Sequence, residues 1–390
     1  MNRFVVAAVA CSFAVCGCST LSGLSAMSEP VTRCGPAHGI ELIVGAHRDA
    51  PAPTLDARLA CQVSDAIRAG KPVSIVVADG RPFVMTLRLL SVTGGTLAQQ
   101  DSPRVQTDVQ RVKAALAAAR PDSAGVDDLA ALAVAADEAR SSGVRDPEFV
   151  LLDSGLDDRG ALDFTVPGLV AAAAAEVTMQ LQASGDVPDL HGSTVVLAGI
   201  GYTAPPQPPL PAKWRSSVTQ IWAAVAKSGG GTVQVIPQPG QGPSVRTAEP
   251  VRSIPVPATP PVRPAGHATI RFTGESAVRF VPDSSAFADP AAAMRALTPI
   301  ARWLAAGPDR RARLEGTTAD VGALAGQIEL SRLRADHVRD ALIQLGAARP
   351  QLATAGVGSR FPQFIRDRNS AGTLLAGPAT LNRSVRITLT

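Results

Sequence analysis

The chain has 390 residues, which is too long for one compact core and long enough for two domains of ordinary size. Hydrophobic residues make up 46% of the sequence, so the composition is that of a globular protein. The formal net charge is only +4 at pH 7, and no basic run interleaved with aromatic residues occurs, so the sequence does not indicate nucleic-acid binding.

The first residues have the pattern of an export signal. A positive start is followed by an apolar stretch that ends at Val15. The stretch is shorter than the roughly 20 residues that a permanent membrane-spanning helix needs, so we expect residues 1–17 to be removed. Gly17 directly before Cys18 resembles the lipobox of bacterial lipoproteins, in which the cysteine is acylated and becomes the new N-terminus. The alternative is a plain secretory peptide that is cut near Ala26.

Lipidation at Cys18 would give a stable membrane anchor. Two or three acyl chains such as palmitate hold a protein firmly, because each buried methylene adds roughly 0.8 kcal/mol. Residues 18–34 are small and polar without periodicity, which is typical of a tether. The sequence therefore predicts a lipoprotein of the cell envelope that faces the periplasm or the cell wall.

Two further cysteines remain after cleavage at Cys18. Cys34 and Cys61 would lie outside the cytoplasm, where disulfides persist, and we predict that they pair. Two buried free thiols are the alternative. A metal site is not expected, since no histidines or other cysteines cluster nearby.

Short apolar runs alternate with helical patterns in residues 35–236. The strand-length runs are 40–44, 72–78, 83–90, 149–152, 194–198 and 232–236. The helical patterns are 59–69, 107–119, 126–140, 166–183 and 216–227. This order predicts a Rossmann-like three-layer α/β domain.

Residues 237–266 change the character of the chain. Prolines recur every few residues, and their missing N–H groups and fixed φ oppose both helix and sheet. We expect a Pro-rich linker, which serves either as a semi-stiff spacer between two layers of the envelope or merely as a domain separator.

Residues 267–390 predict a second, compact domain. Strands are expected at 272–280, 311–316, 352–356 and 384–389, and helices at 290–305 and 330–345. The order βαβαββ is typical of an α/β sandwich.

Four motifs in this region carry a resemblance to the OmpA-like domain. They are FVPDS at 280–284, a central block with LEGTTADVG at 314–322 and LSRLRA at 330–335, GVG at 356–358, and NRSV at 382–385. The region is similar to that family in the order of the motifs and in the spacing from Gly316 to Leu330. The resemblance implies a non-enzymatic domain that holds the peptidoglycan cell wall.

In that family an aspartate on a loop and an arginine on the following helix hold the two ends of diaminopimelate in the wall's stem peptide. A zwitterion of this kind presents a carboxylate to a guanidinium fork and an ammonium to a carboxylate. The resemblance places Arg334 at the arginine position, but Ala319 stands at the aspartate position, with Asp320 one residue later. Either Asp320 turns inward to replace the missing acid, or the ammonium end is recognised differently.

Three further residues complete the expected peptidoglycan-binding set, namely Thr317, Gln327 at the family's asparagine position, and Arg383 in the closing strand motif. For Arg334 the alternative is a helix-surface arginine in a salt bridge. For Arg383 it is an arginine that closes the sheet.

The first domain offers weaker signals. Asp153 ends an apolar strand, where open α/β sheets bind ligands, and the pair Gly199 and Gly201 follows another strand. The spacing after Asp153 departs from the von Willebrand metal-site pattern, so no divalent ion is predicted. Trp214 and Trp222 are expected in the core. We expect no catalytic residue and no cofactor, because the five histidines are scattered and no nucleophile elbow or zincin helix occurs.

Three functions stay open. In the first, the chain is a peptidoglycan-binding lipoprotein that links membrane to wall. In the second, the α/β domain is an envelope sensor or solute-binding module, and the second domain merely positions it. In the third, the altered loop has lost wall binding and the second domain serves protein assembly. An envelope protein is a possible partner of the α/β domain.

Overall fold

The computed structural model describes residues 34–90, 102–237, 243–258 and 260–390. The expected signal peptide, the lipidation site Cys18 and residues 18–33 of the tether lie outside the described residues. Within the described part of the chain, no helix is long and apolar enough to cross a bilayer.

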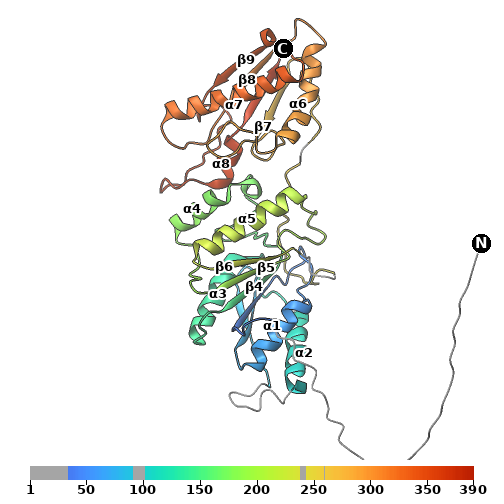
Figure 1. The fold of residues 1–390 in the computed structure, drawn as a ribbon, viewed down its shortest axis with the longest axis vertical. Helices are drawn as coiled ribbons and strands as arrows, with labels where there is room; N and C mark the ends of the chain where they lie inside the picture. Colours follow the sequence, from blue (N-terminus) through green and yellow to red (C-terminus); the bar gives the residue numbers. More distant parts are fainter. Residues whose placement is uncertain (1–33, 91–101, 238–242, 259) are drawn as a thin grey trace, which may run out of the picture. The chain divides into compact units, whose positions relative to one another are not determined.

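A six-stranded sheet forms the centre of the first domain (Figure 1). Its strands are β1 (Ile40–Val44), β2 (Val73–Val77), β3 (Phe83–Met85), β4 (Glu148–Leu152), β5 (Thr194–Ala198) and β6 (Thr232–Ile236). Their order is β3-β2-β1-β4-β5-β6, and all neighbours pair in parallel except β3, which is antiparallel to β2. This is the strand order of a doubly wound Rossmann fold, as the sequence predicts.

Helices cover both faces of this sheet. One face carries α1 (Ala57–Arg68) and α2 (Ser102–Ala118), the other carries α3 (Asp128–Ser141) and α5 (Ala212–Ser228), and α4 (Ala174–Ser184) packs against α5. Alternate residues of each strand point to opposite faces, so that Leu42 packs with α1 and α2 whereas Ile43 packs with α3 and α5. Trp214 and Trp222 are fully buried on the α3 and α5 side, which confirms the prediction of core packing.

One expected helix is interrupted. The sequence pattern predicts a single helix over 166–183, but the structure has a short 3-10 helix η2 (Leu169–Ala171) and then α4. Gly168 has a φ of +89°, which lies outside the helical region, and Pro167 precedes it. The chain therefore turns at Gly168, and α4 begins only after Ala172 and Ala173, whose backbone is extended with ψ of 152° and 126°. The expected strand at 83–90 is likewise shorter and ends at Met85.

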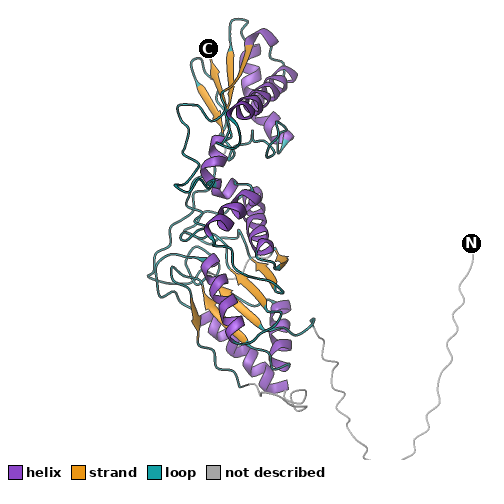
Figure 2. Cartoon of the chain, turned by 90° about the vertical axis from the view of Figure 1, so that its left-hand side faces the viewer, coloured by secondary structure: helices purple, strands orange, loops and turns teal. Residues whose placement is uncertain are grey.

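The second domain is a two-layer sandwich (Figure 2). Its elements are β7 (Thr269–Phe272), α6 (Pro290–Ala305), β8 (Ala312–Gly316), α7 (Leu324–Gln344), the 3-10 helix η3 (Arg349–Gln351), β9 (Leu352–Gly356), α8 (Ala376–Asn382) and β10 (Val385–Leu389). The sheet order is β7-β10-β8-β9, with β10 antiparallel to both neighbours and β8 parallel to β9. Helices α6 and α7 bury their apolar faces on one side of the sheet.

Two expectations for this domain are wrong. The strand expected at 272–280 lies at 269–272, because a turn follows Phe272, with the N–H of Ser276 donating to the carbonyl of Thr273. Helix α8 was not expected, since its short sequence contains Gly377 and a proline and has no helical periodicity.

The Pro-rich segment has no helix or strand in residues 243–258, as expected, but it is not a free spacer there. Val251 and Ile254 are buried in the core of the α/β domain. The N–H of Ile254 also donates to Gln207, and Trp214 donates to the carbonyl of Pro257. Apolar residues between the prolines therefore attach this part of the segment to the first domain.

The predicted disulfide is confirmed. Cys34 and Cys61 are bonded, with their Cα atoms 5.9 Å apart, so the start of the described chain is joined to α1. The N–H of Cys34 also donates to the carboxylate of Asp65 at 2.7 Å.

Candidate functional site

A cavity of about 200 Å³ lies where the loop after β8 meets the first half of α7. Its lining includes Asp283, Thr318, Ala319, Gln327, Arg334 and Arg383. Three of these residues carry charge, and they come from three separate segments of the second domain. The fold therefore gathers one carboxylate and two guanidinium groups at one small cavity.

Arg334 provides the main charge of this cavity. It sits in the middle of α7 and is only 1% exposed. Its Nε donates to the carbonyl of Ser284 at 3.0 Å, and its guanidinium lies 5.2 Å from the ring centre of Phe280. Its Nη1 has no hydrogen-bond partner among the residues that the structure describes. A buried guanidinium with an unused donor beside a cavity is a binding group for an anion.

Burial lowers the pKa of Arg334 to about 10, and the neighbouring positive charge of Arg383 adds to this shift. The side chain still carries its charge at neutral pH, because that pKa lies well above 7. A cation that is held away from water gains more than an exposed one from a bound carboxylate. The expected alternative for Arg334, a helix-surface arginine in a salt bridge, does not describe this buried side chain.

Arg383 lines the same cavity but is already engaged. It follows α8, and its guanidinium forms a two-pronged ion pair with Glu176 of α4, with Nη1 and Oε2 2.8 Å apart. The two side chains are 19% and 14% exposed. The arginine that the resemblance assigns to the ligand therefore holds a carboxylate of the first domain.

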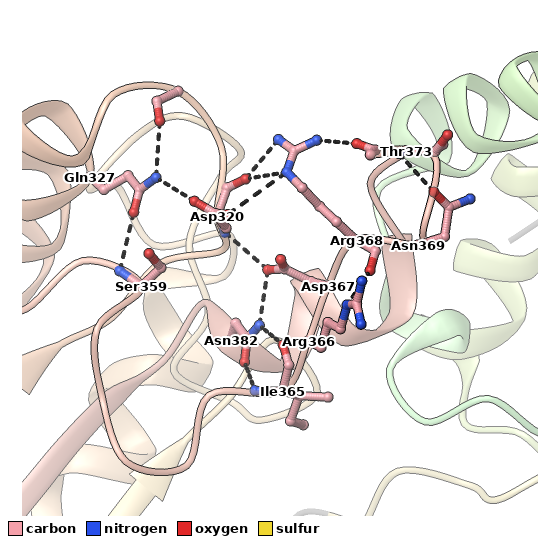
Figure 3. A network of polar contacts seen from close by, with 12 residues as sticks. Asp320, Gln327, Ser359, Ile365, Arg366, Asp367, Arg368, Asn369, Thr373 and Asn382 are labelled. Carbon is pink, nitrogen blue, oxygen red and sulfur yellow. Dashed lines mark hydrogen bonds and ion pairs between the residues drawn. The ribbon is translucent and has the colours of Figure 1, made fainter.

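Asp320 is not among the residues that line the cavity, and its carboxylate takes part in a network of polar contacts (Figure 3). The carboxylate accepts a hydrogen bond from Nε2 of Gln327 at 3.0 Å, and its side chain is 51% exposed. The backbone of Asp320 is also held, because its N–H donates to Asp367 and its carbonyl accepts from Arg368. Asp320 thus ties the loop to the segment before α8.

Gln327 and Thr317 are held within the domain. The side chain of Gln327 donates to Asp320 and to the carbonyl of Gly322, and it accepts from the N–H of Ser359. Thr317 is fully buried, and its hydroxyl contacts the hydroxyl of Ser384 at 2.7 Å, which joins the ends of β8 and β10. Gln327 lines the cavity, whereas Thr317 is not part of the lining.

Asp283 is the acidic residue of the cavity, and no role was assigned to it from the sequence. It is exposed, its φ is +52°, and its charge acts on Arg334. Ala319 presents only a methyl group to the same cavity. The signal that could have identified Asp283 is its place in the opening motif at 280–284, directly before the carbonyl that Arg334 binds.

The residues singled out in the first domain meet at the carboxyl edge of its sheet. A cavity of about 440 Å³ there is lined in part by Asp153 and Gly199. Asp153 is buried and paired with Nε2 of His47 at 3.0 Å. Burial favours the neutral form of both side chains, but their mutual attraction outweighs it, so the pKa of His47 is raised and that of Asp153 is lowered. These shifts favour the charged form of both side chains, and the pair is internal to the domain.

Comparison with solved structures gives matches to the second domain. The peptidoglycan-associated lipoprotein from Burkholderia pseudomallei is 25% identical and has a TM-score of 0.25, with 29% of this chain and 88% of that chain covered. The periplasmic domain of Helicobacter pylori MotB is 21% identical with a TM-score of 0.26, and the match covers 31% of this chain and 81% of that chain. The OmpA-like domain of FopA1 from Francisella tularensis is 17% identical with a TM-score of 0.24, covering 31% and 73%.

Among curated proteins, none matches the chain. A protein-family model does match, and its 94 aligned positions include the cavity residues Asp283, Ala319 and Arg334. The match contains three of the four motifs, and the motif at 382–385 lies beyond it; the resemblance is thereby confirmed for residues 279–372, which are a domain of the OmpA family.

Proposed function

We propose that this chain is a non-enzymatic lipoprotein of the cell envelope that binds peptidoglycan through its second domain and links membrane to wall. The observation that carries the proposal is Arg334, a buried guanidinium beside a cavity of about 200 Å³ whose Nη1 has no partner in the described part of the chain. The match to the OmpA family over residues 279–372 supports the choice of ligand. Lipidation at Cys18 supplies the membrane end of the link.

The ligand that fits this site is the diaminopimelate of the stem peptide. Its free carboxylate binds Nη1 of Arg334, since a charge-assisted hydrogen bond satisfies the unused donor. Its ammonium binds Asp283, which is the acidic group in the cavity lining. Asp320, Gln327 and Thr317 support the loop and the strand ends around the ligand, and Arg383 is a second guanidinium at the cavity.

Sedimentation of the full chain with insoluble, diaminopimelate-type peptidoglycan tests the proposal. The parent is expected in the pellet, and Arg334→Ala is expected in the supernatant, because losing one buried charge-assisted contact costs about 2 to 5 kcal/mol. Arg332→Ala is the matched control, since Arg332 lies on the same helix but is half exposed and pairs with Glu329 and Asp336. A parent that remains in the supernatant would contradict wall binding and favour a role in protein assembly.

A second candidate function concerns the first domain. The cavity of about 440 Å³ lies at the carboxyl edge of the parallel sheet, where open α/β sheets bind ligands. In this reading the α/β domain is a sensor or solute-binding module, and wall binding positions it. Native mass spectrometry of the purified chain distinguishes this function from wall anchoring alone, because a retained small molecule is expected only for a solute-binding module.

A further inference from the structure

Helix α8 connects the cavity of the second domain to the first domain. Ala376, at its start, is fully buried and belongs to the apolar cluster around α3 and α5. The N–H of Ala376 donates to Oε1 of Gln180 on α4 at 2.9 Å. On the other side, the N–H of Gly168 donates to the carboxylate of Glu275 at 2.9 Å. Apolar burial and the hydrogen bond to Gln180 therefore hold α8 against η2 and α4, and the bond to Glu275 joins Gly168 to the turn after β7.

Two glycines bring the backbones into direct contact at this place. A Cβ atom on Gly168 would lie 2.2 Å from the carbonyl oxygen of Gly377, and a Cβ on Gly377 would lie 2.8 Å from the carbonyl oxygen of Pro167. Both distances are shorter than any real contact of a Cβ atom. The close approach thus depends on glycine on both sides, and it brings α4 within reach of Arg383.

Glu176 is the residue of α4 that pairs with Arg383 across this close contact. Its carboxylate takes both prongs of the Arg383 fork, which is the arrangement that a ligand carboxylate would need. The negative charge of Glu176 also reaches Arg334, where it opposes the lowering of the pKa by Arg383. Of the two guanidinium groups at the cavity, one is therefore neutralised from within the chain.

We infer that the α/β domain restrains wall binding, with Glu176 as an internal competitor that holds Arg383 and keeps it from the ligand. The inference rests on the proposed function, because it assigns a regulator to the same cavity. While Glu176 holds Arg383, the ligand binds through Arg334 and Asp283. When Glu176 is released, Arg383 adds a second cation, and peptidoglycan is held more tightly. The first domain thus controls the affinity of the second domain for peptidoglycan.

The full chain with Glu176→Gln tests this inference in the peptidoglycan sedimentation assay. Glutamine keeps the shape of the side chain but loses the charge, so we expect about tenfold tighter binding, the change that follows from losing about 1.4 kcal/mol of internal competition. Glu138→Gln is the matched control, because it removes a carboxylate from α3, which packs on the sheet of the α/β domain. It is expected to bind like the parent.

The double variant Glu176→Gln/Arg383→Gln shows whether the gain comes from Arg383. We expect it to bind no more tightly than Arg383→Gln alone, since the released fork is then missing. Binding of Glu176→Gln within twofold of the parent would overturn the inference and leave the wall-binding function intact. A gain that persists in the double variant would overturn it as well. Failure of the parent and of Glu176→Gln alike to sediment would instead count against the proposed function itself.

Discussion

The carboxylate of Asp320 accepts a hydrogen bond from the side-chain amide of Gln327 at 3.0 Å (Figure 3). The pair lies beside the cavity of Arg334, but only Gln327 contributes to its lining. Asp320 stands one residue after the position of the family's aspartate, and its carboxylate holds the loop against α7. The cavity keeps Ala319 at the family position and receives its acidic group from Asp283.

Replacing Asp283 and Asp320 by asparagine in separate variants shows which carboxylate binds the ligand's ammonium. We predict that Asp283→Asn weakens sedimentation with peptidoglycan about tenfold or more, because a charge-assisted hydrogen bond is worth roughly 1.5 to 3 kcal/mol. Asp320→Asn keeps an oxygen for Gln327 and is expected to bind within about threefold of the parent. The reverse ranking would mean that Asp320 turns inward when ligand is bound.

The carboxylate end of the ligand can be tested without changing the protein. Lysine differs from diaminopimelate by the absence of the terminal carboxylate, so lysine-type peptidoglycan leaves Nη1 of Arg334 unpaired in a buried site. We predict that the full chain sediments with diaminopimelate-type peptidoglycan and at least about a hundredfold less well with the lysine type. Isothermal titration with the two soluble stem peptides measures the ratio, and equal affinities would contradict a carboxylate-directed site.

Much of the fold could be predicted from the sequence, because strand-length apolar runs have few other interpretations. Strands β1, β5, β6 and β9 lie at the expected residues, and α6 has the expected bounds. The interrupted helix at 166–183 could not be predicted, since it depends on the extended backbone of Ala172 and Ala173 and on the positive φ of Gly168. The conformation of Gly168 serves a close approach to Gly377, a residue more than 200 positions away.

The site was predictable to the extent that it follows a motif. The order and spacing of the family motifs single out Arg334, and the structure has it in the lining of a cavity, while its contact with peptidoglycan stays a prediction. The pairing of Arg383 with Glu176 could not be predicted, because it joins residues 207 positions apart in different domains. The side chain of Asp320 is held by Gln327 and its backbone by Asp367 and Arg368, and no local pattern contains all of these residues.

The disulfide should contribute measurably to the stability of the first domain. Closing the loop between Cys34 and Cys61 restricts the unfolded chain, and a loop of this length gives about 3 to 4 kcal/mol. We predict that Cys34→Ser/Cys61→Ser unfolds at a clearly lower urea concentration than the oxidised parent. The fluorescence of the buried Trp214 and Trp222 reports this transition.

Reductant provides the control for the disulfide. It is expected to lower the urea midpoint of the parent to that of the double variant and to leave the double variant unchanged. A double variant that unfolds at the midpoint of the oxidised parent would show that the bond does not constrain the unfolded chain.

Glu41 is expected to make the first domain less stable as the pH rises. It lies on β1 and is fully buried, and burial raises its pKa from the ordinary 4.5 to about 8, with Glu138 adding to the rise and Ser74 opposing it. The folded state therefore retains a proton that the unfolded state has already lost between these pH values. Because the folded pKa is the higher one, this group favours folding at low pH, and its contribution falls as the pH rises toward 8.

The variant Glu41→Gln removes this titration while it keeps the shape of the side chain. We predict that between pH 5 and pH 9 the free energy of unfolding of the parent falls by roughly 4 kcal/mol relative to that of Glu41→Gln, since each pKa unit corresponds to about 1.36 kcal/mol. Urea titrations at both pH values measure the difference. Glu329→Gln is the control, because Glu329 is exposed on α7 and should change the pH profile far less. Parallel profiles for the parent and Glu41→Gln would mean that water reaches Glu41 in the folded protein and keeps its pKa near the ordinary value.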